Sequence, residues 1–468
     1  DNYDFNNFNK YDTFWIVFLN MGALMGFAYY CMRESTSKLV WSISQPENAT
    51  QVDRRATVAS MIRQSDVVET LRQSLIPGEL DVHNHKEAQG EVRFTAKSTY
   101  DVAWYRANTG EVQQSRGCRL VFRNLGYAGL NKNDPKQGQI KLLNSVSGRA
   151  HPGEMCALMG ASGAGKSTLL DVLAGRKTTG ELSGDILFNG AERNSFVMRS
   201  SAYVMQDNVH IGVLTVRESM DYAGRLRLKE ELSEKSREKQ IQKVLDMLGL
   251  TEVADTLVGD ENIRGISGGQ CKRLSIGVEI VALPDLIFLD EPTTGLDSSI
   301  SYEVMSAVRN LANQNRTVIC TIHQPSPLTY MLFDKLLLMA SGKVIYFGPS
   351  RDIVNYFSSS PYKFPYKVGS NPADYLVAVG GGFIQASSGK TISGEELATY
   401  YASGDLYRLF IENIDTMVAM DLAAVGPQTT EVLSDYNTST INQMKTLCHR
   451  MVVKTIKLRK PTVATFMR

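Results

Sequence analysis

Apolar residues in this 468-residue chain gather in short runs separated by helical patterns, which is typical of an α/β domain. Residues 155–159 (MCALM), 286–289 (LIFL) and 318–322 (VICTI) are such runs, each long enough for a buried strand and too short for a helix. Residues 166–174 (KSTLLDVLA) follow the first run and predict a helix. Residues 214–249 also carry helical patterning, with dense Lys and Glu on a face that we expect to be solvated.

One apolar stretch, residues 13–32, contains no charged residue. Twenty helical residues span about 30 Å, the thickness of the hydrocarbon core of a bilayer. Acidic residues precede the stretch, while Arg33 and Lys38 follow it, so we predict a transmembrane span that leads into the cytosol at Arg33. The alternatives are a buried core helix or a signal peptide, and a signal peptide would have a basic start and a shorter apolar core.

A second amphipathic pattern lies near the C-terminus. Ile441, Met444, Cys448, Met451 and then 455–456 recur at helical spacing. From residue 445 onward the chain carries seven Lys or Arg residues and no Asp or Glu. A basic amphipathic helix of this kind is typical of a membrane surface, and the alternative is a helix packed on a soluble domain.

Composition narrows the class of protein. The chain has 50 basic and 49 acidic residues, a net charge of +1, which argues against a dedicated nucleic-acid binder. Its six cysteines are scattered without CxxC spacing, as expected for reduced thiols in the cytosol. At this length the chain exceeds one ordinary domain.

The chemistry starts at residues 160–167 (GASGAGKS), which have the form GxxxxGK[ST] between a strand and a helix. Glycines let successive backbone N–H groups turn toward phosphate oxygens, and the helix N-terminus adds partial positive charge. We expect Lys166 to reach the β- and γ-phosphates of a nucleoside triphosphate and the Ser167 hydroxyl to bind Mg²⁺. The predicted binding residues of this loop are Gly160, Ala161, Ser162, Gly163, Ala164, Gly165, Lys166, Ser167 and Thr168.

Two carboxylates, Asp290 and Glu291, end the second apolar run. We expect Asp290 to hold the hydration shell of Mg²⁺. Because side chains alternate along a strand, Glu291 points differently and is the candidate base for the attacking water. Gln206 and His323 each follow another strand-like run, and either residue alone carries little information.

The order of these elements resembles the nucleotide-binding domain of an ABC transporter. The resemblance covers roughly residues 120–349 and includes Ser267-Gly268-Gly269-Gln270, a Ser-Gly-Gly-Gln element that most phosphate-loop proteins lack. It implies that Ser267 and Gly268 cap the γ-phosphate of an ATP held by a second such domain, with Gly269, Gln270 and Asp297 at the same seam. It also gives Gln206 a role in sensing Mg²⁺ and water, and His323 a contact with the γ-phosphate.

Residues 214–219 (LTVRES), 321–326 (TIHQPS) and 371–375 (NPADY) are similar to the G subfamily, which includes full-size pleiotropic drug resistance transporters. Two departures, Ile266 and Cys271, remove no phosphate-contacting group. By this resemblance Glu218 contacts a transmembrane coupling element. An adenine-stacking role for Tyr127 and a plain surface or core role are equally open.

We therefore predict an α/β ABC ATPase domain with a parallel-sheet core, an antiparallel β subdomain and a helical signature subdomain, preceded by one transmembrane helix. The resemblance implies ATP and Mg²⁺ as cofactors. It implies a second nucleotide-binding domain, transmembrane domains, membrane lipid and a hydrophobic or amphipathic substrate as partners, and no nucleic acid. A multi-pass plasma-membrane exporter with this domain in the cytosol is expected, and the alternative is a soluble ABC-type ATPase or an ATP-switched regulator.

The expected organisation is that of a segment of a full-size transporter carrying its second ATPase. It has five parts: 1–35, the span with short flanks; 36–115, a partly disordered cytosolic linker; 116–350, the nucleotide-binding domain; 351–430, its C-terminal extension; and 431–468, a connecting helix that leads to the next membrane domain.

Overall fold

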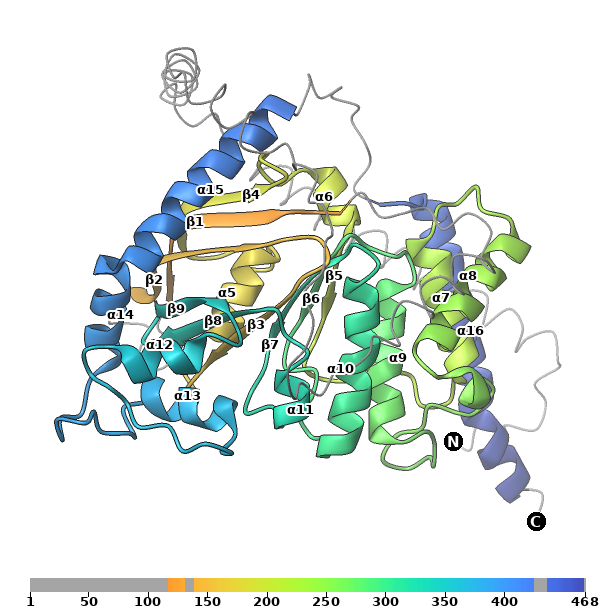
Figure 1. Ribbon diagram of the computed structural model, residues 1–468. Coiled ribbons are helices and arrows are strands. Elements are labelled where there is room, and N and C mark those ends of the chain that lie inside the picture. Colours follow the sequence, from red (N-terminus) through yellow and green to blue (C-terminus); the bar gives the residue numbers. More distant parts are fainter. Residues whose placement is uncertain (1–116, 131–138, 425–435, 467–468) are drawn as a thin grey trace, which may run out of the picture. The chain divides into compact units, whose positions relative to one another are not determined.

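The computed structural model describes residues 117–130, 139–424 and 436–466 (Figure 1). The expected membrane span at 13–32 and the expected linker at 36–115 lie outside these residues. Within the described ranges, no helix combines the length and the apolar character needed to cross a membrane.

A six-stranded, mostly parallel sheet forms the core, in the order β5-β6-β7-β3-β8-β9. All pairs are parallel except β8 with β9, so the predicted parallel-sheet core is confirmed. The three short apolar runs are its centre, and every residue of β3, β6 and β7 is buried. The strands are β3 (Met155–Gly160), β5 (Ser201–Val204), β6 (Leu286–Leu289), β7 (Thr317–Thr321), β8 (Lys335–Ala340) and β9 (Lys343–Pro349).

A second, antiparallel sheet has the order β2-β1-β4, with β1 (Leu120–Leu130), β2 (Gln139–Ala150) and β4 (Glu181–Phe188). Figure 1 shows α5 lying between the two sheets. Leu169, Leu170 and Leu173 of α5 are fully buried in a cluster that includes residues of both sheets. This packing holds the start of α5 next to the end of β3, where the glycine loop joins them.

Helices cover both the core sheet and its edges. Thr215 and Ser267 each start a helix with a capping box. The hydroxyl of the N-cap residue accepts the backbone N–H of residue N3, and the side chain of residue N3 accepts the backbone N–H of the N-cap residue. The helices are α5 (Lys166–Leu173), α6 (Ser195–Arg199), α7 (Val216–Arg227), α8 (Glu234–Met247), α9 (Gly268–Ile280), α10 (Ser298–Ala312), α11 (Pro327–Tyr330), α12 (Ile353–Ser359), α13 (Pro372–Gly380), α14 (Gly394–Ser403), α15 (Asp405–Ala424) and α16 (Thr440–Phe466).

The expected C-terminal extension shares the core of the ATPase domain. Phe357 of α12 and Leu376 of α13 are buried in the cluster that contains β6 and β7. Phe410 of α15 packs on Phe347 of β9, with ring centroids 4.8 Å apart. Helices α12, α13 and α15 therefore pack against the core of the ATPase domain.

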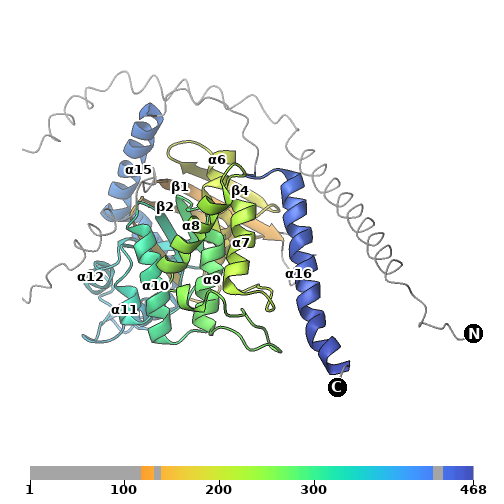
Figure 2. The same cartoon turned by 90° about the vertical axis from the view of Figure 1, so that its right-hand side faces the viewer.

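Helix α16 lies alongside α7 (Figure 2). The His449 ring nitrogen Nδ1 is 3.0 Å from the Tyr222 hydroxyl, and Lys457 Nζ is 2.6 Å from both carboxylate oxygens of Glu218. Ile441 and Ile456 on α16 are exposed, at 79% and 54%. The helix thus contacts the domain through polar groups together with half-buried apolar residues such as Met444 and Leu447, and it leaves other apolar residues exposed.

Candidate functional site

The loop between β3 and α5 takes a shape that its glycines permit. Gly160 has φ of 146°, and a Cβ there would lie 2.3 Å from the carbonyl oxygen of Met339, so no side chain fits. Gly163 and Gly165 also have positive φ, and Gly165 is the N-cap of α5. The loop therefore ends at a helix N-terminus, the arrangement that binds phosphate.

Lys166 points back over this loop. Its side chain is 7% exposed, and Nζ donates to the carbonyl oxygens of Gly160 at 2.9 Å and Ala161 at 3.0 Å. Burial lowers the pKa of Lys166, while the carboxylates of Glu291 and Asp290 act in the opposite direction. The ammonium group is thus held in the loop predicted to cradle phosphate, near both predicted carboxylates.

Asp290 lies at the mouth of the loop. The Ser167 hydroxyl is 3.2 Å from Asp290 Oδ1, and the buried Thr321 hydroxyl donates to the same oxygen at 2.7 Å. The Tyr203 hydroxyl is 3.3 Å from Oδ2. A hydroxyl and a carboxylate oxygen converging beside a phosphate loop fit Mg²⁺, which prefers oxygen ligands together with substrate phosphates. Ser167 and Asp290 are the residues that would hold it.

Glu291 is oriented by three partners. Its Oε2 accepts hydrogen bonds from Gln206 Nε2 at 3.1 Å and from Thr294 Oγ1 at 2.9 Å. Its backbone N–H donates to Thr321 Oγ1 at 2.8 Å. The backbone of Glu291 has φ of 43°, the left-handed region that a non-glycine residue rarely adopts and that is common at functional sites.

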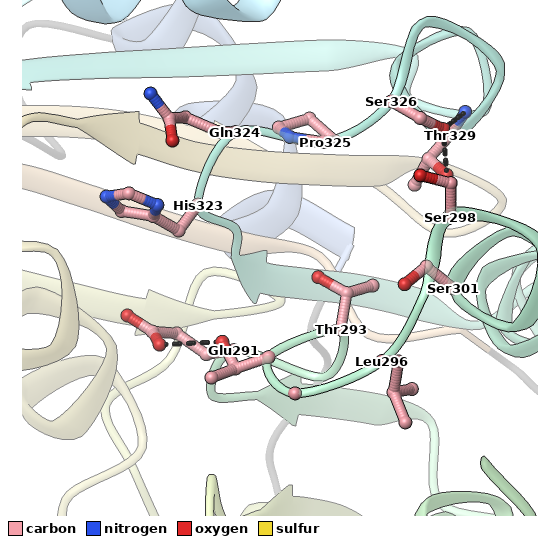
Figure 3. A pocket seen from close by; sticks show the side chains of 12 residues that line it. Glu291, Thr293, Leu296, Ser298, Ser301, His323, Gln324, Pro325, Ser326 and Thr329 are labelled. Atoms are coloured by element: carbon pink, nitrogen blue, oxygen red, sulfur yellow. Dashed lines mark hydrogen bonds between the residues drawn. The ribbon is translucent and has the colours of Figure 1, made fainter.

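A cavity of about 500 Å³ opens beside Glu291 and is lined by His323, Thr293, Ser301 and neighbouring residues of two loops (Figure 3). Figure 3 shows the side chains of Glu291 and His323 directed to the same side of this space. His323 is exposed, so its ring is accessible to a ligand. The structure therefore brings together Lys166, Ser167, Asp290, Glu291, Gln206 and His323, which the sequence analysis selected.

The Ser-Gly-Gly-Gln element begins helix α9. Ser267 Oγ accepts the Gln270 N–H at 3.3 Å, and Gln270 Oε1 accepts the Ser267 N–H at 2.9 Å. A Cβ on Gly269 would lie 2.2 Å from Ile300 Cγ2 of α10, the helix that Asp297 caps. The starts of α9 and α10 therefore pack together, and they leave Ser267, Gly268 and Asp297 exposed.

Sequence reasoning missed Lys272, one residue beyond Cys271. Its side chain is 2% exposed, and Nζ donates to the carbonyl oxygens of Met205 at 3.0 Å and Gln206 at 2.8 Å. Burial lowers the pKa of Lys272, and Asp290 and Asp207 act against that shift. Lys272 thereby ties α9 to the segment that carries Gln206.

Tyr127 lies on β1. It is 6% exposed in the antiparallel sheet, and its hydroxyl donates to the carbonyl oxygen of Thr179 at 2.7 Å. A buried ring with a committed hydroxyl favours the core role over adenine stacking.

Two family profiles match the chain. One, described as ABC transporter, matches residues 143–294, and another, described as ABC-2 type transporter, matches residues 323–463. The described part of the second range contains β8, β9, α11 to α15 and most of α16.

The chain is also similar to individual proteins of known family. ABC transporter G family member 3 of Dictyostelium discoideum is 36% identical over 363 residues, which cover 75% of this chain and 25% of the relative. The mouse broad substrate specificity ATP-binding cassette transporter ABCG2 is 44% identical over 279 residues, 58% of this chain and 42% of the relative. ABC transporter G family member 51 of rice is 36% identical over 394 residues, 79% of this chain and 26% of the relative. The chain thus spans less than half the length of each of these relatives.

The mixed sheet, the phosphate loop and the Ser-Gly-Gly-Gln helix define the class of this domain, an ABC-type ATPase that binds ATP. Within that class, the chain belongs to the G family of ABC transporters.

Proposed function

We propose that this domain drives export of a hydrophobic or amphipathic substrate across a membrane by hydrolysing ATP. The observation that carries the proposal is the hydrogen-bonded group around Glu291. Its carboxylate is held by Gln206 and Thr294, next to the cavity lined by His323. A base fixed beside a phosphate loop is what activation of an attacking water requires.

In this proposal Lys166 holds the β- and γ-phosphates, and Ser167 and Asp290 hold Mg²⁺. When bound, Mg²⁺ neutralises charge on the phosphates. Glu291 accepts a proton from the attacking water, and Gln206 orients both. His323 donates to the γ-phosphate, where negative charge develops.

We further propose that a second, facing domain completes the site. The exposed N-terminus of α9, with Ser267 and Gly268 at its tip, supports this idea because helix N-termini favour anions. Asp297 caps the adjacent helix on the same surface. Closure of two such domains around ATP would move the membrane domains attached to them.

The attachment is proposed to run through α7 and α16. Glu218 and Tyr222 of α7 contact Lys457 and His449 of α16. The apolar residues that α16 leaves exposed, such as Ile441 and Ile456, fit a membrane domain or lipid. Finer parts of the same proposal are the full-size pleiotropic drug resistance type, which the G-subfamily motifs support, a place as the second ATPase, and location in the plasma membrane.

Two variants of the full-length protein in membranes test the catalytic assignment. Glu291→Gln can keep both hydrogen bonds, because Gln206 and Thr294 both donate to Oε2, and the amide oxygen of glutamine can take that place. We expect ATP binding to persist while turnover falls about 10²- to 10⁴-fold, the usual contribution of a general base. Lys166→Ala should instead lose ATP affinity.

Glu303→Gln, a change of an exposed carboxylate on α10, serves as the control and should behave like the parent. Equal ATP turnover by Glu291→Gln and the parent would remove Glu291 from the mechanism. Transport assays in sealed vesicles then separate an exporter from an ATPase without transport.

A further inference from the structure

Thr321 occupies the junction between the two predicted acidic residues. It is the last residue of β7 and is fully buried, with 0% exposure. Its Oγ1 donates to Asp290 Oδ1 at 2.7 Å and accepts the Glu291 N–H at 2.8 Å. One hydroxyl thus contacts the side chain of one acidic residue and the backbone of the next.

The proton inventory fixes the direction of both bonds. A threonine hydroxyl has one hydrogen to donate and lone pairs to accept with. A backbone N–H can only donate, so the hydroxyl hydrogen is left for the carboxylate of Asp290. Because β6 pairs with β7 in parallel, with Leu289 opposite Cys320, the ends of the two strands hold these groups in register.

Other donors near Asp290 are not dedicated to it. The Tyr203 hydroxyl is closer to Asp171 Oδ1, at 2.8 Å, than to Asp290 Oδ2, at 3.3 Å. Burial and both carboxylates raise the pKa of Tyr203, so it stays protonated with a single hydrogen to share. Ser167 is exposed and would turn toward a metal ion. The buried donor committed to Asp290 is therefore Thr321.

The backbone of Glu291 needs a partner as well. Its φ of 43° is unfavourable for a glutamate, and such a conformation persists only when the surroundings hold it. The bond to Thr321 is the contact made by the Glu291 N–H itself. Losing it would let the peptide turn, and the carboxylate beyond it would leave Gln206 and Thr294.

We propose that Thr321 is a positioning residue for ATP hydrolysis, which sets the metal-binding oxygen of Asp290 and the orientation of Glu291 at the same time. This inference rests on the proposed function of the site. It assigns to the strand before His323 a role that neither the phosphate loop nor the acidic pair supplies.

Three substitutions in the full-length protein test it. Thr321→Val keeps the shape and removes the hydroxyl, and Thr321→Ser restores the hydroxyl. Thr317→Val is the matched control, because Thr317 is also fully buried on β7 but donates to the Cys118 carbonyl oxygen at 2.5 Å, at the other end of the strand. Three quantities are measured: kcat and KM for ATP, the Mg²⁺ concentration that gives half-maximal binding of a non-hydrolysable ATP analogue, and the urea midpoint of unfolding.

We expect Thr321→Val to lower kcat on the order of 10- to 100-fold, as small displacements of catalytic groups do, with a KM within about threefold of the parent. Its Mg²⁺ requirement should rise about tenfold, in line with loss of a partner that orients a metal ligand. Thr321→Ser should recover most of both losses. Thr317→Val should keep the parent kcat and Mg²⁺ requirement, even where its urea midpoint falls.

The proposal is overturned if folded Thr321→Val retains the parent values, or if Thr321→Ser is as impaired as Thr321→Val. If the valine variant does not fold, Thr321→Ala replaces it with the same expectations. If the parent itself hydrolyses no ATP, the proposed function fails, and the Mg²⁺ requirement for analogue binding still decides the role of Thr321.

Discussion

Replacing Lys272 with methionine separates two opposing contributions of a buried charge. Lys272 is 2% exposed and donates to two carbonyl oxygens, those of Met205 and Gln206. Each hydrogen bond from a charged group contributes about 1.5–3 kcal/mol, so about 3–6 kcal/mol is lost in Lys272→Met. Removing the buried ammonium returns a desolvation penalty of several kcal/mol. Methionine keeps most of the stem, so the packing is largely preserved. The lost hydrogen bonds and the removed desolvation penalty are then of similar size and nearly cancel.

We therefore expect the free energy of unfolding of Lys272→Met to lie within about 2 kcal/mol of the parent. Lys272→Ala also deletes the stem and should be less stable than the methionine variant by about 2–4 kcal/mol, a typical penalty for a large core cavity. The ATP turnover of Lys272→Met should fall even though its stability changes little. Once Gln206 is no longer tied to α9, kcat should fall about tenfold in Lys272→Met, with ATP affinity little changed.

Urea unfolding and steady-state ATP turnover, measured on the same membrane preparations, check both expectations. If the methionine variant were as unstable as the alanine variant, removal of the desolvation penalty would not compensate for the lost hydrogen bonds, and the reasoning would be wrong. If it turned over ATP at the parent rate, Lys272 would only fill space between α9 and the Gln206 segment.

Two further predictions concern pH and surface charge. Burial, with the charges of Arg149 and two other basic residues, lowers the pKa of His151 from its usual 6.5 to about 4, so the unfolded chain binds a proton below pH 6.5 that the folded chain does not. Stability should fall between pH 6.5 and 4, and His151→Asn should flatten that decline in urea midpoints taken at several pH values. Glu218→Gln and Lys457→Gln in a double-mutant cycle should give a coupling of about 1 kcal/mol or less, since both side chains are partly exposed. A coupling that persisted undiminished in about 1 M salt would argue against a screened surface pair.

Local patterns predicted the parts of the site that are local in sequence. The glycine loop is encoded within eight residues, and Asp290 and Glu291 follow a four-residue strand whose burial is evident from its composition. Topology then places these strand ends at one edge of a parallel sheet. For that reason the sequence alone could predict that Lys166, Ser167 and the acidic pair lie close together.

Thr321 and Lys272 gave no such signal. The contact of Thr321 with Asp290 depends on the register of β6 against β7, and that of Lys272 with Gln206 joins residues 66 apart in sequence. The position of the Tyr127 ring was also not predictable from the sequence. Register shifts on both sides of it in β1 decide where its ring points, and alternation along a strand does not predict them.

Helix α16 shows a feature that the periodicity of apolar residues does not predict. Its spacing predicts an amphipathic helix, and that is correct, but a pattern of apolar residues does not state which face meets the domain. Here Glu218 and Tyr222 of α7 offer polar partners, which Lys457 and His449 of α16 contact. Of the predicted apolar positions, Ile441, Met451 and Ile456 are exposed, while Met444 and Cys448 are half-buried.

The contacts around Glu291 form a continuous path to the surface proposed to meet a second domain. The Glu291 carboxylate accepts from Gln206, the Gln206 carbonyl accepts from Lys272, and Lys272 belongs to α9, whose first turn carries Ser267. Continuity alone is not coupling, because coupling requires a link with two arrangements. The exposed side chain of Gln206 contacts Glu291, and its backbone carbonyl contacts Lys272, so groups on two different elements hold this residue. Lys272→Met removes the contact with the Gln206 carbonyl and leaves the contact between Gln206 and Glu291. The ATP turnover of this variant therefore measures whether α9 influences Glu291 through Gln206.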